Sequence, residues 1–389
     1  MIQRLALLGA TGSIGASTLE VVRHHPDRLA IATLGAQGRN PDALLALARE
    51  FRPRLLAVGD PEVARALRSQ MPPGVELAGG PEALVAAAAH PEVDKVVAAI
   101  VGAAGLRPVA AALAAGKPVA LANKESLVVA GRLLTDLARR TGAAIVPIDS
   151  EHVALHQALR AGSREEVRRL VLTASGGPFL HRDPATFASI RREEALRHPT
   201  WSMGAKISID SSTLINKGLE LIEASHLFGI PPGAIDVVIH PRSLVHSLVE
   251  FRDGSWLAQL SRNDMIFPIQ YALAYPERWT NEFPRLELAE LGTLEFLPLD
   301  NLRFPAVELA RATLAAGESA PAVLNAVNEV AVHAFLDGEI AYPEILATIS
   351  EVLASHRPEA LADLDAALEW DRWGRQRAGE VLSKRRRAR

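Results

Sequence analysis

Leu5-Ala-Leu-Leu-Gly9-Ala-Thr-Gly12-Ser-Ile-Gly15 is a short apolar strand followed at once by a glycine-rich loop. A helical run continues to about His25 and ends at Pro26. Glycines permit a tight turn, and the free N–H groups at a helix start suit a bound phosphate. The spacing is G-x-x-G-x-x-G, and a plain strand-to-helix turn is the alternative interpretation. The stretch predicts the first β-α unit of a dinucleotide-binding sheet.

The second predicted strand, Leu29 to Leu34, bears on the choice between the two nicotinamide cofactors. An acidic residue at its end would bind the ribose 2′-hydroxyl of NADH, whereas a basic residue accommodates the 2′-phosphate of NADPH. The sequence there is Gly35-Ala-Gln-Gly-Arg39-Asn40, without an acid. Arg39 therefore favours NADPH. Asn40-Pro41 is also a good start for the next helix, so a loop that only caps this helix is the alternative.

Strand-like and helical runs then alternate as far as Ile148. The expected strands are 55–58, 96–100, 119–121 and 144–148, and the expected helices are 43–51, 83–89, 108–115 and 127–141. Nearly continuous apolar strands that alternate with helices predict a parallel, doubly wound α/β sheet. Ligand-binding loops then lie at the carboxyl ends of the strands.

Charged residues follow two of these strands. Lys124 stands in Ala122-Asn-Lys-Glu-Ser126 at a helix start, where a cation is unfavourable unless an anion is also present. Asp149 and Glu151 flank Ser150, and such close carboxylates repel each other unless they are protonated, bonded or share a cation. An all-oxygen ligand set favours Mg²⁺ or Mn²⁺, with Glu220 as the third ligand. The alternative is that both acids only cap the helix that follows.

A second polar stretch runs from His198 to Glu220. On a helix, Asn216, Lys217 and Glu220 share one face, and together with Ser211 they offer groups that suit a phosphate or a polyol. The segment from Pro199 to Gly204 has an apolar tip and is expected to close over a ligand. A surface loop followed by an ordinary amphipathic helix is the alternative.

The regions around this stretch predict a second sheet and a helical end. Ser175-Gly-Gly is either an anion-binding nest or a tight turn, and Asp253-Gly254 predicts a hairpin in a mixed or antiparallel sheet whose edge could pair subunits. His240 and His246 on this sheet are more often structural than catalytic. Residues 279–301 resemble a linker, and four helices are expected at 306–316, 321–336, 343–355 and 361–382. Asn325, Asn328 and Glu329 could serve a site or bond between helices.

Composition narrows the class of protein. The 389 residues include no cysteine and carry a net charge of −3. Disulfides, thiolate metal sites and cysteine nucleophiles are therefore excluded, and nucleic acid is not an expected partner. No signal-like start and no membrane-length apolar run is evident, so we expect a cytoplasmic protein without a membrane partner. The basic residues of 384–389 are expected to form a solvated tail.

Seven motifs in order give the chain a close resemblance to the 1-deoxy-D-xylulose 5-phosphate reductoisomerase family. They are Gly9-Ala-Thr-Gly-Ser-Ile-Gly, Ala122-Asn-Lys-Glu-Ser, Asp149-Ser-Glu-His, Ser175-Gly-Gly-Pro-Phe, His198-Pro-Thr-Trp-Ser-Met-Gly, Ile215-Asn-Lys-Gly-Leu-Glu and Asn325-Ala-Val-Asn-Glu. Thr200, Ala205 and the segment 263–268 are small departures that remove no donor or ligand.

The resemblance implies a V-shaped homodimer that rearranges a ketose phosphate and reduces the resulting aldehyde to 2-C-methyl-D-erythritol 4-phosphate with NADPH and Mg²⁺ or Mn²⁺. It implies an NADPH-binding domain at 1–149, an α+β catalytic and dimerisation domain at 150–278, a linker at 279–301 and a helical bundle at 302–389.

The resemblance also assigns site residues in four groups. Catalytic residues are Lys124, Glu151 and His198, and metal ligands are Asp149, Glu151 and Glu220. Substrate contacts are Ser150, Ser175, His198, Trp201, Ser211, Asn216, Lys217 and Glu220, with Met203 beside Trp201 as a cover. Cofactor contacts are Thr11, Gly12, Ser13, Ile14, Gly38, Arg39, Asn40, Asn123, Glu125 and Gly204.

Three other classes of protein are weighed against this one. A semialdehyde dehydrogenase shares the glycine loop but requires a cysteine nucleophile, which the chain lacks. A homoserine-type dehydrogenase leaves Asp149, Glu151 and Glu220 unexplained. An NADP(H)-sensing regulatory protein would not oxidise NADPH with a ketose phosphate.

Overall fold

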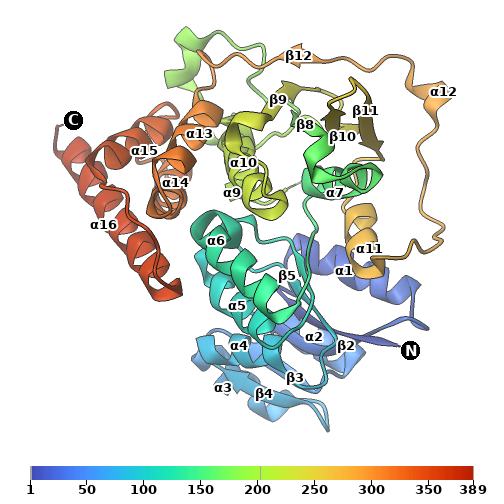
Figure 1. Ribbon diagram of the computed structural model, residues 1–389. Coiled ribbons are helices and arrows are strands. Elements are labelled where there is room, and N and C mark those ends of the chain that lie inside the picture. Colours follow the sequence, from blue (N-terminus) through green and yellow to red (C-terminus); the bar gives the residue numbers. More distant parts are fainter. Residues whose placement is uncertain (1, 202, 389) are drawn as a thin grey trace. The chain divides into compact units, whose positions relative to one another are not determined.

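The computed structural model describes residues 2–201 and 203–388, and the chain divides into two compact units. The first unit contains Met1–Ser126, Leu134–Val153 and Asp264–Phe283, and the second contains Leu127–Leu133, Ala154–Asn263 and Pro284–Arg389. Figure 1 draws their elements in the colours of the sequence. Residues 264–278, which we expected in the catalytic domain, group with the first unit.

A seven-stranded parallel sheet forms the centre of the first unit, in the order β4-β3-β2-β1-β5-β6-β7. The strands are β1 Gln3–Leu8, β2 Leu29–Ala36, β3 Leu55–Val58, β4 Glu76–Gly79, β5 Lys95–Ala98, β6 Val119–Leu121 and β7 Ile145–Pro147. The strand order reverses direction between β1 and β5, so right-handed crossovers place helices on both faces. The predicted doubly wound sheet is confirmed.

The helices of this unit are α1 Ser13–His24, α2 Pro41–Phe51, α3 Pro61–Leu67, α4 Pro81–Ala89, α5 Leu106–Ala114, α11 Ile266–Ala274 and α6 Lys124–Thr141, of which residues Leu127–Leu133 group with the second unit. Proline occupies the start of α2, α3 and α4, where its missing N–H costs no helical bond. We did not predict α3 or β4. β4 is a half-exposed edge strand without an apolar run, so its sequence carries no strand pattern.

The second unit is built on a mixed five-stranded sheet in the order β11-β10-β8-β9-β12. Its strands are β8 Val167–Ala174, β9 Ile235–Ile239, β10 Val245–Phe251, β11 Trp256–Leu260 and β12 Leu297–Pro298. The predicted hairpin joins β10 to β11, and Gly254 at its turn has φ +87°. The predicted linker supplies β12, which pairs with β9, although two residues that include a proline give no strand signal.

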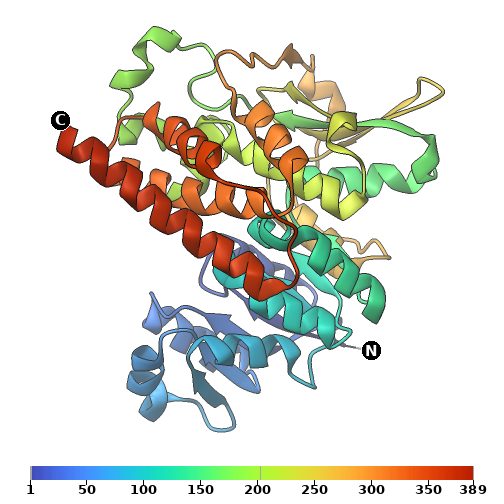
Figure 2. The ribbon, with the colours of Figure 1, turned by 60° about the vertical axis from the view of Figure 1, so that its left-hand side comes forward.

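Nine helices of the described residues complete this part of the chain. They are α7 Ser150–Ala158, which crosses the boundary between the units, α8 Arg192–Ala195, α9 Ala205–Ser212, α10 Ile215–Phe228, α12 Leu288–Leu291, α13 Ala306–Ala316, α14 Ser319–Leu336, α15 Glu344–Ser355 and α16 Leu364–Ala388. The four predicted C-terminal helices are confirmed, and α16 runs alongside α14 (Figure 2).

The basic C-terminal segment is not a loose tail. Helix α16 continues through it, and Arg385 forms an ion pair with Glu351 at 2.7 Å while Arg386 contacts Glu339. Cations in a last helical turn are favourable beside the free carbonyl groups. The segment is therefore helical, and Lys384, Arg386 and Arg387 remain exposed to solvent as predicted.

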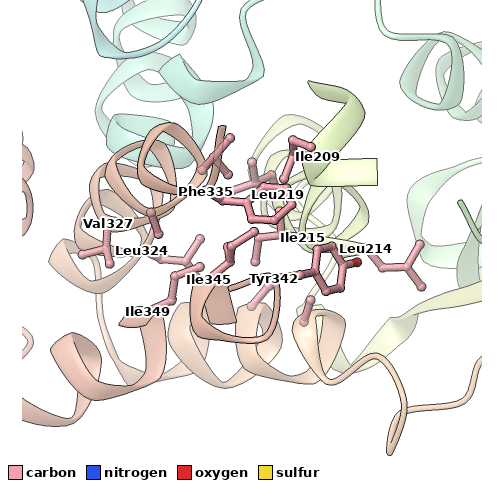
Figure 3. Close-up of a cluster of buried hydrophobic side chains, with 14 of the residues drawn as sticks. Ile209, Leu214, Ile215, Leu219, Leu324, Val327, Phe335, Tyr342, Ile345 and Ile349 are labelled. Atoms are coloured by element: carbon pink, nitrogen blue, oxygen red, sulfur yellow. The ribbon is translucent and has the colours of Figure 1, made fainter. Parts of the chain in front are cut away.

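One apolar core joins α9 and α10 to the C-terminal helices. Ile209, Leu219 and Phe335 come from α9, α10 and α14, and Figure 3 shows their side chains gathered with those of the neighbouring helices. The helices that carry the predicted substrate residues therefore rest on the C-terminal bundle. Within the described residues, no helix combines the length and the apolar character that a membrane crossing would require.

Candidate active site

The glycine loop after β1 is shaped by close backbone contacts. Gly9 has φ +92°, and a Cβ atom there would lie 2.3 Å from the carbonyl oxygen of Ala99. A Cβ atom on Gly15 would lie 2.4 Å from the carbonyl oxygen of Gly9. Both positions therefore exclude any larger residue, and the loop must stay tightly folded against the start of α1.

The amino end of α1 is open to a ligand. Gly12 is its N-cap, no side chain caps the helix, and its first turn contains no acidic residue. Thr11, Gly12 and Ser13 are exposed, and Ile14 is half-buried. Uncapped N–H groups at an exposed helix start fit a pyrophosphate, so the loop and α1 meet the requirements of a dinucleotide.

The segment after β2 supports both interpretations offered by its sequence. Asn40 accepts a hydrogen bond from the backbone N–H of Ala43 at 3.1 Å and so caps α2. Gly38 has φ +104° and is buried against Val58 and Val63, which turns the chain outward. Arg39 is exposed next to this turn. The guanidinium group can therefore meet a 2′-phosphate while Asn40 holds the helix start.

Asn123 ties together the loops that follow β5 and β6. It is 2% exposed, and its amide nitrogen donates to the carbonyl oxygens of Ile100 at 2.6 Å and Gly102 at 3.0 Å and to the carboxylate of Glu125 at 3.0 Å. Its oxygen accepts from the backbone N–H of Ser126 at 3.1 Å. Asn123 and Glu125 thus hold together the loops at the carboxyl ends of β5 and β6, where a cofactor is expected to bind.

Lys124 and Asp149 form a buried ion pair beside this edge. The ammonium nitrogen lies 2.6 Å from the Asp149 carboxylate, and the two side chains are 9% and 17% exposed. Asp149 follows β7 and Lys124 follows β6, which are neighbouring parallel strands. The anion that a lysine at this helix start requires is therefore supplied by the chain itself. Ser150 donates to the carboxylate of Glu151 at 2.6 Å.

In the second unit, α10 confirms the predicted shared face. The amide of Asn216 donates to the Glu220 carboxylate at 2.6 Å, and the Lys217 ammonium contacts the same carboxylate. Lys217 is 3% exposed and Glu220 is fully buried. In this arrangement the donors of Asn216 and Lys217 hold Glu220, where the sequence led us to expect contacts with a phosphate.

His198 joins the loop after α8 to the turn after β8. Its Nδ1 accepts from the backbone N–H groups of Thr200 at 3.2 Å and Trp201 at 3.0 Å, so the proton of the neutral ring lies on Nε2. Nε2 therefore donates to Ser175 Oγ at 3.0 Å. Burial lowers the pKa of His198 to about 4, which keeps the ring neutral near pH 7.

Ser175 is left with a proton to offer. Its Oγ also accepts from the backbone N–H of Gly177 at 3.1 Å, so both lone pairs are occupied. Gly176 and Gly177 have φ +84° and +68°, and a Cβ atom on Gly177 would lie 2.8 Å from the carbonyl oxygen of Ser211. The N–H of Gly177 is thus used inside the turn, which favours the tight-turn interpretation and leaves only the N–H of Gly176 for an anion.

The predicted closing segment, Pro199 to Gly204, follows His198 directly. Trp201 and Met203 are half-buried, Gly204 is exposed, and the ring of Trp201 lies 6.4 Å from that of His246. Ser202 lies outside the described residues. Closure over a substrate stays a prediction.

The remaining candidates have structural partners. His240 Nδ1 bonds the carbonyl oxygen of Glu295 at 2.7 Å, and His246 Nε2 bonds Ser261 Oγ at 2.9 Å. The amide of Asn325 bonds Glu329 at 3.2 Å, and the amide of Asn328 bonds Asp210 at 2.9 Å. Sequence reasoning missed Asp210, although its distance of four residues from Lys206 was a readable signal.

Each unit thus gathers part of the predicted site. The glycine loop, Asn123, Lys124 and Asp149 follow neighbouring strands of the first sheet. The second unit brings together Ser175, His198 and the helices that carry Ser211 and Glu220. The metal set of Asp149, Glu151 and Glu220 takes members from both units and stays a prediction.

Three family models match consecutive parts of the chain. Residues 5–131 match 1-deoxy-D-xylulose 5-phosphate reductoisomerase, residues 145–228 match the C-terminal domain of that enzyme, and residues 260–377 match the DXP reductoisomerase C-terminal domain. The matches follow the order of the motifs along the chain.

Relatives and solved structures agree over the full length. The 1-deoxy-D-xylulose 5-phosphate reductoisomerases of Anaeromyxobacter dehalogenans and Geobacter metallireducens are each 50% identical, over 99% and 98% of this chain and 98% and 99% of those proteins. A DOX-P reductoisomerase crystallised with NADPH, fosmidomycin and magnesium is 43% identical, with a TM-score of 0.92 over 98% of both chains. The Zymomonas mobilis enzyme in complex with NADPH is 41% identical, with a TM-score of 0.92 over 98% of this chain and 99% of that one. The chain therefore belongs to the 1-deoxy-D-xylulose 5-phosphate reductoisomerase family.

Proposed function

We propose that this chain converts 1-deoxy-D-xylulose 5-phosphate to 2-C-methyl-D-erythritol 4-phosphate, using NADPH and Mg²⁺ or Mn²⁺. The reaction is an intramolecular rearrangement followed by hydride transfer, and it supplies isoprenoid precursors through the methylerythritol phosphate pathway. The buried pair of Lys124 and Asp149, placed at the same sheet edge as the glycine loop, is the observation that carries the proposal. The test is oxidation of NADPH with this substrate, with and without the divalent cation.

The residues present fit both groups that the reaction requires. The glycines that exclude a Cβ atom and the uncapped start of α1 suit NADPH, which supplies the hydride. Asp149, Glu151 and Glu220 offer hard carboxylate oxygens in a chain without cysteine. They would hold a divalent cation, which supplies Lewis-acid polarisation of the substrate oxygens.

Lys124 would act on the charge that develops during the rearrangement. Its ammonium group is fixed by Asp149 at 2.6 Å, and its side chain is only 9% exposed. A preorganised cation in such a place stabilises an enolate oxygen without having to reorganise, and it can relay a proton. Ser150 and Glu151 follow Asp149 directly in sequence and would contact the reacting end of the substrate.

The second unit would bind the phosphate end. The free proton of Ser175, the N–H of Gly176 beside it and the hydroxyl of Ser211 would supply the donors, while the N–H of Gly177 stays bonded to Ser175 Oγ. Lys217 and Asn216 would complete this set of donors once the divalent cation competes for the Glu220 carboxylate. Neutral His198 holds Ser175 in place and would touch the phosphate from the side, and Trp201 and Met203 would cover the substrate.

We also propose that the protein is a cytoplasmic homodimer that uses the open edge of the mixed sheet. Trp256 and Leu257 on the edge strand β11 are 45% and 38% exposed. Exposed apolar residues on an unpaired edge favour pairing with another chain. The domain boundaries at 149, 278 and 301 belong to the same proposal.

NADPH should be preferred over NADH by a factor of about ten or more in kcat/KM, because a charge-assisted phosphate contact contributes roughly 1.5–3 kcal/mol. Arg39→Ala should remove most of this preference and leave the NADH reaction almost unchanged. Arg68→Ala, at another exposed arginine of the same unit, is the control. Equal kcat/KM values for the two cofactors in the parent enzyme would contradict the assignment of Arg39.

Trp201→Ala should raise KM for the sugar phosphate and lower kcat together, because closure over the substrate completes the site. The Kd for NADPH, measured by fluorescence titration, should stay within about twofold. Phe296→Ala removes another partly exposed aromatic ring of the same unit and serves as the control. Unchanged steady-state constants for Trp201→Ala would mean that the segment is only surface.

A further inference from the structure

Asp210 is a buried carboxylate in α9 that the proposed mechanism does not use. It is 1% exposed, its Oδ2 lies 2.6 Å from the ammonium nitrogen of Lys206, and its Oδ1 accepts from the amide of Asn328 at 2.9 Å. Asn328 is fully buried on α14. A buried charge persists only when it is paired and hydrogen-bonded, so this three-residue network accounts for the carboxylate.

The network anchors a helix that could not hold its own orientation. Helix α9 has only eight residues, a length at which an isolated helix is marginal in water. Three consecutive residues of its last turn are fixed from different sides. Asp210 bonds Asn328, the carbonyl oxygen of Ser211 lies against Gly177, and the carbonyl oxygen of Ser212 accepts from the hydroxyl of Tyr342 at 2.6 Å. The rotation of α9 about its axis is thereby set.

Lys206 occupies a position that helix energetics disfavour. It lies in the first turn of α9, where the helix dipole repels a cation, and it precedes its acidic partner by four residues, which is the weaker orientation of such a pair. Its ammonium group compensates the negative charge of Asp210, which adjoins Ser211 in sequence. An uncompensated carboxylate there would repel an anionic ligand.

We infer that Lys206, Asp210 and Asn328 are positioning residues for the phosphate subsite. They fix the rotation of α9 so that the Ser211 backbone stays against Gly177 of the Ser175-Gly176-Gly177 turn, and Lys206 neutralises the Asp210 carboxylate next to Ser211. The inference rests on the proposed function, because it assigns the phosphate of the substrate to this turn. Supporting residues that lock the geometry of a binding site typically affect affinity without touching the ligand.

Inorganic phosphate, as a competitive inhibitor of the sugar phosphate, is the probe for this subsite. Asn328→Leu should raise its inhibition constant and the KM of the substrate by about tenfold, with a smaller fall in kcat. Asn325→Leu is the matched control, because Asn325 is equally buried on the same helix but bonds Glu329. That variant should keep both constants within about twofold.

Lys206→Met is a second test of the same inference, and it remains informative if Asn328→Leu does not fold. It should weaken phosphate binding by about tenfold, and Lys206→Arg should restore it, because the arginine keeps the charge beside Asp210. The Kd for NADPH should stay unchanged in both variants. An unaltered phosphate constant in Lys206→Met would overturn the inference, whereas a parent enzyme without turnover would instead overturn the proposed function.

Discussion

Lys124→Met should lower kcat by about a hundredfold to a thousandfold, the loss typical of removing one preorganised donor from a developing oxyanion. Methionine fills nearly the same space, so the loss reflects the charge. Divalent-cation affinity should not fall, because Asp149 loses the ammonium group that lies 2.6 Å from it and becomes a stronger ligand. Steady-state kinetics and Mn²⁺ titration followed by electron paramagnetic resonance measure the two effects separately.

Lys95→Met is the matched control for this variant. Lys95 is also a buried lysine of the first unit, but it lies at the amino end of β5, whereas Lys124 follows the carboxyl end of β6. Its ammonium donates to the carbonyl oxygens of Ala272 at 3.1 Å and Leu273 at 2.8 Å. Burial lowers its pKa to about 8, so its charge is easily lost. A kcat near that of the parent is expected, and a normal kcat for Lys124→Met would contradict the assigned role.

Local patterns in the sequence were sufficient to predict much of the fold. Buried parallel strands are continuous apolar runs, so β1, β2, β3, β5, β6 and β7 could be located from sequence alone. The glycine loop could be predicted from its spaced glycines. Gly9 and Gly15 must be glycine because nearby backbone atoms leave no room for a side chain. The face shared by Asn216, Lys217 and Glu220 followed from helical spacing, and the contacts of Asn216 and Lys217 with the Glu220 carboxylate confirm it.

Elements that depend on distant partners could not be predicted. Strand β12 exists because Leu297 and Pro298 meet β9, and nothing in two residues announces this pairing. The partner of Lys124 was expected to be some anion, but its identity as Asp149 required the neighbouring strand. Asn328 and Asp210 stand 118 residues apart, so their bond is invisible without the fold.

The protonation of the site was also beyond the sequence. The proton on His198 Nε2 follows from two backbone N–H groups that point at Nδ1. The pKa of about 4 follows from burial, which is a property of the folded chain. Since the unfolded ring has a pKa near 6.5, the unfolded state binds more protons between these values. This ring therefore contributes a loss of stability as the pH falls from about 6.5 to 4.

Glu220→Gln should weaken binding of Mg²⁺ or Mn²⁺ and reduce turnover by at least about a hundredfold, because loss of a hard ligand removes Lewis-acid stabilisation worth several kcal/mol. NADPH binding should stay normal. The fold should survive, since the glutamine oxygen can still accept from Asn216, but Lys217 loses its buried counter-charge. A lower Tm is therefore expected even without metal.

Glu250→Gln separates the role of position 220 from the general loss of a buried acid in the second unit, since Glu250 is 4% exposed on β10 and pairs with Arg168 and Arg169. It should keep the Kd for Mn²⁺ within about threefold of the parent. The affinity for the divalent cation then distinguishes Lys124→Met from Glu220→Gln. Both lose turnover, but only Glu220→Gln should lose metal affinity, because its carboxylate is the ligand whereas Lys124 competes with the cation for Asp149. Normal turnover of Glu220→Gln at limiting metal would remove Glu220 from the metal site and leave Asp149 and Glu151 without their third ligand.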